Sequence, residues 1–131
     1  MATRAGDWFR QAEADLLHAR HALRDGHHEW ACFAAQQAAE KAAKAAHQGL
    51  GQEAWGHSVT ELLQALQAQV PLVDDVLLDR ARSLDKLYVP TRYPNGLPAG
   101  APADYYTSSE AERAIADAEA VLACCRRVLS R

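Results

Sequence analysis

Hydrophobic residues recur every three or four positions along most of this chain, and that spacing is typical of amphipathic α-helices. The pattern predicts a first helix that ends before Gly26 and a second that runs from about His28 to His47. A third helix is expected after Ser58 and a fourth after Pro71. The stripes consist of Trp8, Ala12, Leu16, Ala19 and Leu23 in the first helix, Val59, Leu62, Leu63 and Leu66 in the third, and Val73, Leu77, Ala81, Leu84 and Tyr88 in the fourth.

Two of the expected helix starts carry capping signals. Ser58 is followed three residues later by Glu61, which is the spacing of a capping box. The segment "TSSEAERA" contains two overlapping boxes, one from Thr107 to Glu110 and another that begins at Ser109. A fifth helix is therefore expected here, and its stripe consists of Ala111, Ile115, Ala118, Leu122, Cys125 and Leu129.

The connections between the first four helices are short, and no segment shows the alternation of a β-strand. Short connections favour antiparallel neighbours. The predicted fold class is therefore all-α, an up-and-down four-helix bundle with a fifth helix after a long loop. The 131 residues fit one hydrophobic core, so we expect a single helical domain over residues 1–131.

Alanine lies on every face of the second helix, in the segment "WACFAAQQAAEKAAKAAH". Small residues let helix backbones approach closely, so we expect this helix at the centre of the bundle or on a dimer face. One stripe of the helix consists of Trp30, Phe33, Gln37 and Lys41. Lys41 either keeps its ammonium in water above a buried stem or points into a pocket that binds an anion. Glu40 and Lys44 are expected to pair on the outer face.

The composition argues against several classes of protein but does not by itself indicate a function. The net charge of −3 argues against unspecific binding to nucleic acid, which needs a strongly basic face. No apolar run approaches the ~20 residues of a membrane span, and the N-terminus does not resemble a signal peptide. The three cysteines are expected to be reduced and buried in a cytoplasmic protein. We assign neither a metal nor a cofactor.

The segment "KLYVPTRYPNGLPAGAPADYY", residues 86–106, contains all four tyrosines and four of the five prolines. Pro90 and Pro94 restrict the backbone on either side of Arg92. A guanidinium held in this way can bind a phosphate with two hydrogen bonds, and tyrosine rings can stack on a base. Alternatively, the tyrosines anchor the loop to the bundle, and Arg92 pairs with Asp85 or Asp104.

The candidate ligand-binding residues are Arg92, Tyr93, Lys41, Lys86, Tyr88 and Asp85. Lys86 lies at the end of the fourth helix, next to the loop. With Arg82 it either adds to a positive pocket or pairs with the aspartates at 79 and 85. His57 either hydrogen-bonds the neighbouring loop or lies in a turn. No catalytic residue is assigned.

Several segments in this order resemble the HEPN domain family (higher eukaryotes and prokaryotes nucleotide-binding). They are "FAAQQAAEKAAKAAH", "HSVTELLQAL", "SLDKLYVPTRYPN" and the closing alanine-rich helix. The most specific of them are Q-Q-A-x-E-K-x-x-K and the R-Y-P-[DN] turn at Arg92, Tyr93 and Pro94. Together the segments cover nearly the whole chain.

The resemblance implies a helical bundle, commonly a homodimer, that is linked to nucleotides or RNA. Many prokaryotic relatives act beside a minimal nucleotidyltransferase as toxin or antitoxin components. Others are metal-independent ribonucleases with a histidine four to six residues after an arginine, but no histidine follows His57 here. We therefore expect a nucleotide-binding partner of a separately encoded nucleotidyltransferase rather than an enzyme. The alternatives are a ribonuclease that uses Arg92, Lys86 and Tyr93, or a plain dimerisation module.

Overall fold

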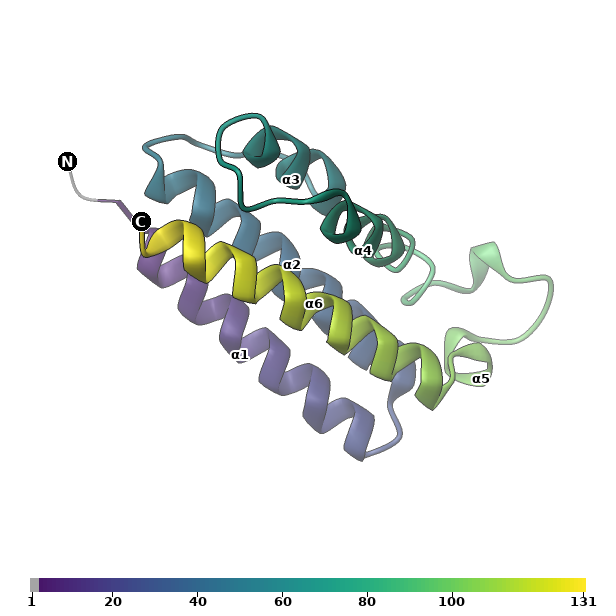
Figure 1. Cartoon of the computed structure of the whole chain (residues 1–131). Helices are drawn as coiled ribbons and strands as arrows, with labels where there is room; N and C mark the ends of the chain where they lie inside the picture. Colours follow the sequence, from purple (N-terminus) through teal and green to yellow (C-terminus); the bar gives the residue numbers. More distant parts are fainter. Residues whose placement is uncertain (1–2) are drawn as a thin grey trace.

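The computed structural model describes residues 3–131, and in this range the chain forms helices and no strands (Figure 1). The helices are α1 (Ala5–Arg24), α2 (His28–Gly49), α3 (Val59–Gln67), α4 (Asp75–Asp85), the short 3₁₀ helix η1 (Pro94–Gly96), α5 (Pro102–Tyr105) and α6 (Ser108–Leu129). The all-α fold class predicted from the sequence is confirmed. The long connection before α6 is not wholly irregular, because it contains η1 and α5.

Helix α2 is the central element of the bundle. It contacts α1, α3, α4, α5 and α6. Figure 1 shows the three long helices α1, α2 and α6 side by side, with the short α3 next to α2 and the short α4 next to α6. The connection from α4 to α6 extends from one end of the bundle, and the start of α1 and the C-terminus lie at the other end.

The alanine content of α2 explains its central position. Nine of its alanines are at most 7 % exposed: Ala31, Ala34, Ala35, Ala38, Ala39, Ala42, Ala43, Ala45 and Ala46. A methyl side chain keeps neighbouring helix axes close while it still removes apolar area from water. The expectation that this helix is crowded from several sides is therefore confirmed.

Trp8 of the predicted stripe packs against the core from a partly buried position, and its neighbour Phe9 is buried as well. One detail of the predicted helices is wrong. Helix α4 ends at Asp85, so Tyr88 does not lie on its apolar face. The chain turns there, with the Leu87 N–H donating to the Leu84 carbonyl. Pro90 disfavours a helical conformation at Val89, so the helix does not resume after this turn.

The expected cap of α3 is present, and of the two overlapping capping boxes expected before α6 only one forms. The Ser58 hydroxyl accepts the Glu61 N–H at 3.1 Å, so Ser58 caps α3. At the start of α6 both hydrogen bonds of the Thr107–Glu110 box form. The box that begins at Ser109 is not used, because that residue already lies inside the helix.

All three cysteines are free and buried, as expected. Burial raises the pKa of the Cys32 thiol to about 12 and also raises the pKa values of Cys124 and Cys125. Protonated thiols of this kind are poor nucleophiles. The cysteines therefore act as packing residues of the core.

A buried carboxylate of α6 faces α4. The side chain of Asp117 is 9 % exposed, and Arg80 Nη1 donates to it at 2.9 Å. Burial raises the pKa of Asp117, while Arg80 acts in the opposite direction. Arg80 therefore makes a charged Asp117 tolerable at neutral pH.

Replacing Arg80 by Met should lower the free energy of unfolding by about 1–2 kcal/mol near neutral pH, because Asp117 is left without its cation. Arg80 is itself well exposed, so the loss is smaller than for a fully buried pair. Without Arg80 the pKa of Asp117 rises further. In the variant, Asp117 of the folded state therefore takes up a proton as the pH falls, and the loss in free energy of unfolding shrinks toward about pH 4.

Urea unfolding of Arg80→Met at several pH values tests this prediction. Arg82→Met is the matched control, because Arg82 pairs with Asp79 at 2.8 Å on an exposed surface. The control should change stability by less than about 0.5 kcal/mol. Equal losses in the two variants would contradict the account of Asp117.

Candidate functional site

The loop that carries Arg92 is fixed to the bundle at its start. Thr91 is 2 % exposed, and its hydroxyl donates to the Leu87 carbonyl at 2.7 Å. The Arg92 N–H donates to the Val89 carbonyl at 3.1 Å, which closes a turn around Pro90. The backbone on both sides of Arg92 is therefore well defined before any ligand is present.

The Arg92 side chain is held by one carbonyl and three aromatic rings. Its Nε and Nη2 atoms donate to the Tyr88 carbonyl at 2.9 and 2.7 Å. The guanidinium carbon lies 4.3 Å from the ring centre of Phe33, 4.8 Å from that of Tyr88 and 5.3 Å from that of Tyr93. A guanidinium has five N–H groups. Two of these donate to the Tyr88 carbonyl, and among the described residues the other three have no acceptor, so they are available to a ligand.

Arg92 does not pair with either aspartate considered from the sequence. Asp104 accepts the Ala101 N–H at 2.9 Å. The Asp85 carboxylate caps α3 from α4. It accepts from the Ser58 hydroxyl (3.1 Å), from the Val59 N–H (2.8 Å), and from the N–H and hydroxyl of Thr60 (3.0 and 2.6 Å). Both acids thus serve backbone geometry and leave the positive charge of Arg92 unneutralised.

The ring of Tyr88 stacks on His57, with ring centres 4.8 Å apart and an angle of 19° between the planes. His57 Nδ1 lies 3.2 and 3.3 Å from the two carboxylate oxygens of Glu40. An ionised carboxylate only accepts hydrogen bonds, so Nδ1 carries the proton. In the neutral ring Nε2 is then the acceptor, on a side chain that is 59 % exposed.

Glu40 is the centre of a buried polar network. Its side chain is 6 % exposed and accepts from Lys44 at 3.1 Å and from Gln36 at 3.4 Å. Gln36, which is fully buried, also donates to the His57 carbonyl at 3.2 Å and accepts from Gln37 at 2.7 Å. The prediction that Glu40 and Lys44 pair on the outer face is wrong about the place. The pair forms at the core boundary, because His57 and Gln36 complete the hydrogen bonding of the carboxylate.

Sequence reasoning missed His57 and Glu40 as a pair, since they lie 17 positions apart. One signal was available. Gln36, Gln37 and Glu40 are polar residues on a helix whose other positions are mostly alanine, and some of them had to be buried. Buried polar groups require partners, and these come from another segment.

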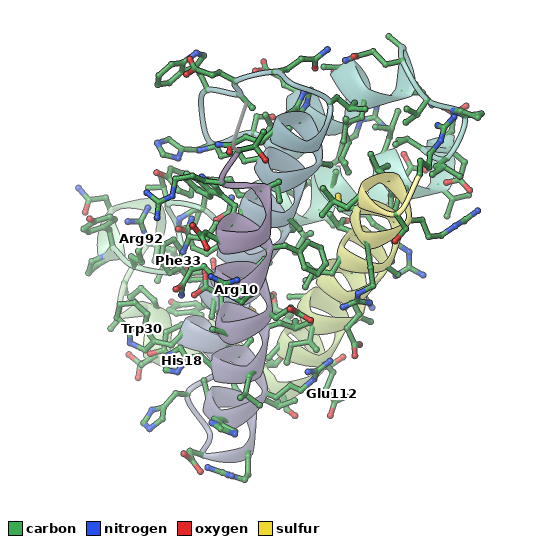
Figure 2. The ribbon with its side chains drawn as sticks, turned by 90° about the vertical axis from the view of Figure 1, so that its left-hand side faces the viewer. Arg10, His18, Trp30, Phe33, Arg92 and Glu112 are labelled. Carbon is green, nitrogen blue, oxygen red and sulfur yellow. The ribbon has the colours of Figure 1, made fainter. Side chains whose placement is uncertain are left out.

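Lys41 lies two helical turns from Phe33 on α2, and its ammonium pairs with Asp15 of α1 at 2.5 Å. The two side chains are 23 % and 17 % exposed. The pair joins α1 to α2. The pair lines a cavity together with Trp30 and Gln37. Arg92, Phe33, Trp30 and His18 lie along one side of the molecule in Figure 2, whereas Glu112 lies on another.

Lys86 is exposed and lines a different cavity, between α4 and α6, with Tyr106 and Arg113. The structure therefore does not group it with Lys41. Arg82 pairs with Asp79 rather than with the loop. Tyr106 packs against the core, and burial raises the pKa of its phenol. This tyrosine is a loop anchor, whereas Tyr93 is 50 % exposed.

Two further features concern metals and membranes. His18 and His21 are both exposed. Among residues 3–131, no three histidine, cysteine or acidic side chains come together as metal ligands. Within the same range no helix combines the length and apolar character needed to cross a membrane.

The fold and the site define a small helical-bundle protein with an arginine held among aromatic rings, beside a carboxylate–histidine pair. The HEPN domain model matches residues 5–128. The chain therefore belongs to the HEPN domain family.

Solved structures agree with this assignment. A protein from Thermus thermophilus is 47 % identical, with a TM-score of 0.90, and the match covers 98 % of this chain and 100 % of that one. An archaeal HEPN homologue is 39 % identical, with a TM-score of 0.81 and coverage of 98 % and 99 %. A HEPN domain protein from Thermotoga maritima is 41 % identical, with a TM-score of 0.78 and coverage of 95 % and 98 %. Among proteins with curated descriptions, no match is found.

The role of Asp85 can be tested directly. Asp85→Ala removes four hydrogen bonds at the start of α3 and the favourable charge at that helix end, so it should lower stability by about 2 kcal/mol. The control Asp79→Ala alters a carboxylate that is 78 % exposed and should have little effect. Thermal or urea unfolding measures both. An Asp85→Ala protein as stable as wild type would contradict this capping role.

Proposed function

We propose that this HEPN protein binds a nucleotide through Arg92, Tyr88 and Tyr93. The observation that carries the proposal is the geometry of Arg92. Its guanidinium is oriented by the Tyr88 carbonyl and flanked by three rings. It takes part in none of the ion pairs found among residues 3–131.

An oriented guanidinium binds phosphate well because its N–H groups match two phosphate oxygens at once. The side chain loses little conformational freedom on binding, since the Tyr88 carbonyl already holds it. The half-exposed ring of Tyr93 offers a face for the base or the sugar. The group that would bind the phosphate, Arg92, and the ring that would contact the base or sugar, Tyr93, thus lie next to each other.

The other predicted residues take indirect or secondary parts in this proposal. Asp85 orders the start of α3 and thereby the position of His57, one residue before the cap. Lys86 adds positive charge near the loop and attracts an anion at longer range. Lys41 lies farther along α2, next to Asp15.

The wider role rests on family membership. We infer that the protein acts in the cytoplasm as a homodimer and works with a separately encoded minimal nucleotidyltransferase, as in toxin–antitoxin systems. The R-Y-P-N turn at residues 92–95 supports this assignment within the family. A site that binds a nucleotide suits a partner of a nucleotide-transferring enzyme.

Nucleotide binding should weaken at least tenfold in Arg92→Ala, because the variant loses the bidentate contact to phosphate. Isothermal titration with GMP, AMP, CMP, UMP, ATP and a short RNA measures the effect. Arg92→Lys keeps the charge without the planar fork and should fall between wild type and Arg92→Ala. Arg82→Ala is the matched control and should bind like wild type. Equal affinity in Arg92→Ala would contradict the proposal, and so would a wild-type protein that binds none of these ligands.

A second candidate function is metal-independent cleavage of RNA. The favouring observation is that Glu40 orients His57, and that the ring of Tyr88 contacts both His57 and Arg92. A histidine with a free Nε2 acts as a general base, and an arginine stabilises the charge that develops on the phosphate. No histidine follows Arg92 in the sequence, but His57, from the connection before α3, could take its place.

For this candidate, single-stranded RNA should be cleaved in the presence of a chelator, and His57→Gln should lower the rate at least about 100-fold. His18→Gln changes an exposed histidine of α1 and serves as the control for purification and folding. If wild type and His57→Gln leave RNA equally intact or degrade it equally, His57 is not a catalytic base.

A further inference from the structure

A cavity of about 250 Å³ lies between α1 and α2. It is adjacent to Arg92, because Phe33 contacts the guanidinium and also lines the cavity. Its walls are apolar on one side, where Trp30 and Phe33 meet edge to face with ring centres 6.2 Å apart, and where Ala34 leaves room. Trp30 is 49 % exposed despite its size. Sites for drug-sized ligands start at about 300 Å³, so this cavity suits a single flat ring system rather than a whole nucleotide.

The rest of the lining is polar and consists of Asp15 and His18 of α1 and Gln37 and Lys41 of α2. The Asp15 carboxylate accepts from Lys41 at 2.5 Å and from Gln11 at 2.8 Å. A carboxylate has about four acceptor positions, so about two remain. The Gln37 amide nitrogen donates to Gln36 at 2.7 Å, which leaves the carbonyl oxygen of Gln37 as an acceptor. The Lys41 ammonium is the donor beside this carboxylate.

We propose that this cavity binds a purine base and prefers guanine. The pairing edge of guanine offers two neighbouring N–H donors, N1 and N2, beside one acceptor, O6. The two donors match the Asp15 carboxylate, and O6 matches Lys41. Adenine lacks the N1 proton, so it leaves an acceptor of Asp15 unpaired, and an unpaired buried polar group is costly. The indole of Trp30 supplies the stacking face.

The cavity and Arg92 are joined by one ring. Phe33 lies under the guanidinium at 4.3 Å and also forms part of the cavity wall. Figure 2 shows Arg92, Phe33 and Trp30 one after another along the same side of the molecule. A guanine nucleotide would place its base against Trp30 and its phosphate on Arg92. This inference therefore rests on the proposed function and specifies its ligand.

Titration of the full-length protein with GMP, AMP, XMP and guanosine tests the proposal. GMP should bind at least tenfold more tightly than AMP. Guanosine should bind more weakly than GMP, and GMP should fall to the affinity of guanosine in Arg92→Ala. Trp30→Ala should weaken all purines, whereas Trp55→Ala, a change at an 82 % exposed indole elsewhere, should have no effect.

Asp15→Asn gives the sharpest readout. Xanthine has a carbonyl where guanine has the N2 amino group, and an asparagine amide can donate to that carbonyl. The variant should therefore lose at least tenfold in affinity for GMP and gain affinity for XMP. A carboxylate with a purely structural role would weaken both ligands equally when replaced. Circular dichroism and thermal unfolding confirm that the variant is folded.

The outcomes separate the two proposals. Binding that depends on Arg92 but does not distinguish GMP from AMP, with Asp15→Asn unchanged, would overturn the guanine cavity and leave nucleotide binding intact. Absence of any binding would overturn both. If Trp30→Ala instead dissociates a dimer in light scattering and leaves nucleotide affinity unchanged, this face is an interface between copies and the guanine cavity is wrong.

Discussion

The buried charge of Glu40 is the constraint on which the site depends. A carboxylate in the low-dielectric edge of a core requires several donors, and here Lys44, Gln36 and His57 provide them. To serve as a donor, His57 must lie against α2, so this contact helps to position the end of the connection before α3, together with the cap that Asp85 provides. Tyr88 stacks on His57, and the Tyr88 carbonyl in turn orients Arg92. One polar group of α2 thus determines a chain of contacts that ends at the proposed ligand.

The same helix meets a second demand, that of close packing on nearly all sides. Alanine satisfies it, since it carries almost no side-chain entropy and lets other helices approach. The cost is a core with few large side chains and little apolar area for each residue. Leucines of α3, α4 and α6 compensate, among them the fully buried Leu63, Leu66 and Leu84. The large aromatic rings of α2, Trp30 and Phe33, are thereby left at the surface, where they can contact a ligand.

The fold could be predicted largely from the sequence, because helix period, caps and helix breakers act locally. The stripe of α3, the Ser58 cap and the Thr107 box all depend on residues within one or two turns. The site could be predicted only in part. Arg92 and its tyrosines were found because prolines and aromatic residues cluster within one segment. Their contacts with α2 were not found, because Phe33 lies 59 positions before Arg92 and nothing local links them.

By itself the sequence determined the helices, the close packing expected around the alanine-rich segment and the choice of Arg92 as a candidate residue. These follow from local periodicity and from the conformational limits of proline and glycine. Only the tertiary structure decided that Glu40 is buried, that Asp85 caps another helix and that Lys41 faces Asp15 rather than water. The physical reason is that a charged group takes its role from the partners that packing places beside it. Those partners lie on other helices, at distances along the chain that no periodicity encodes.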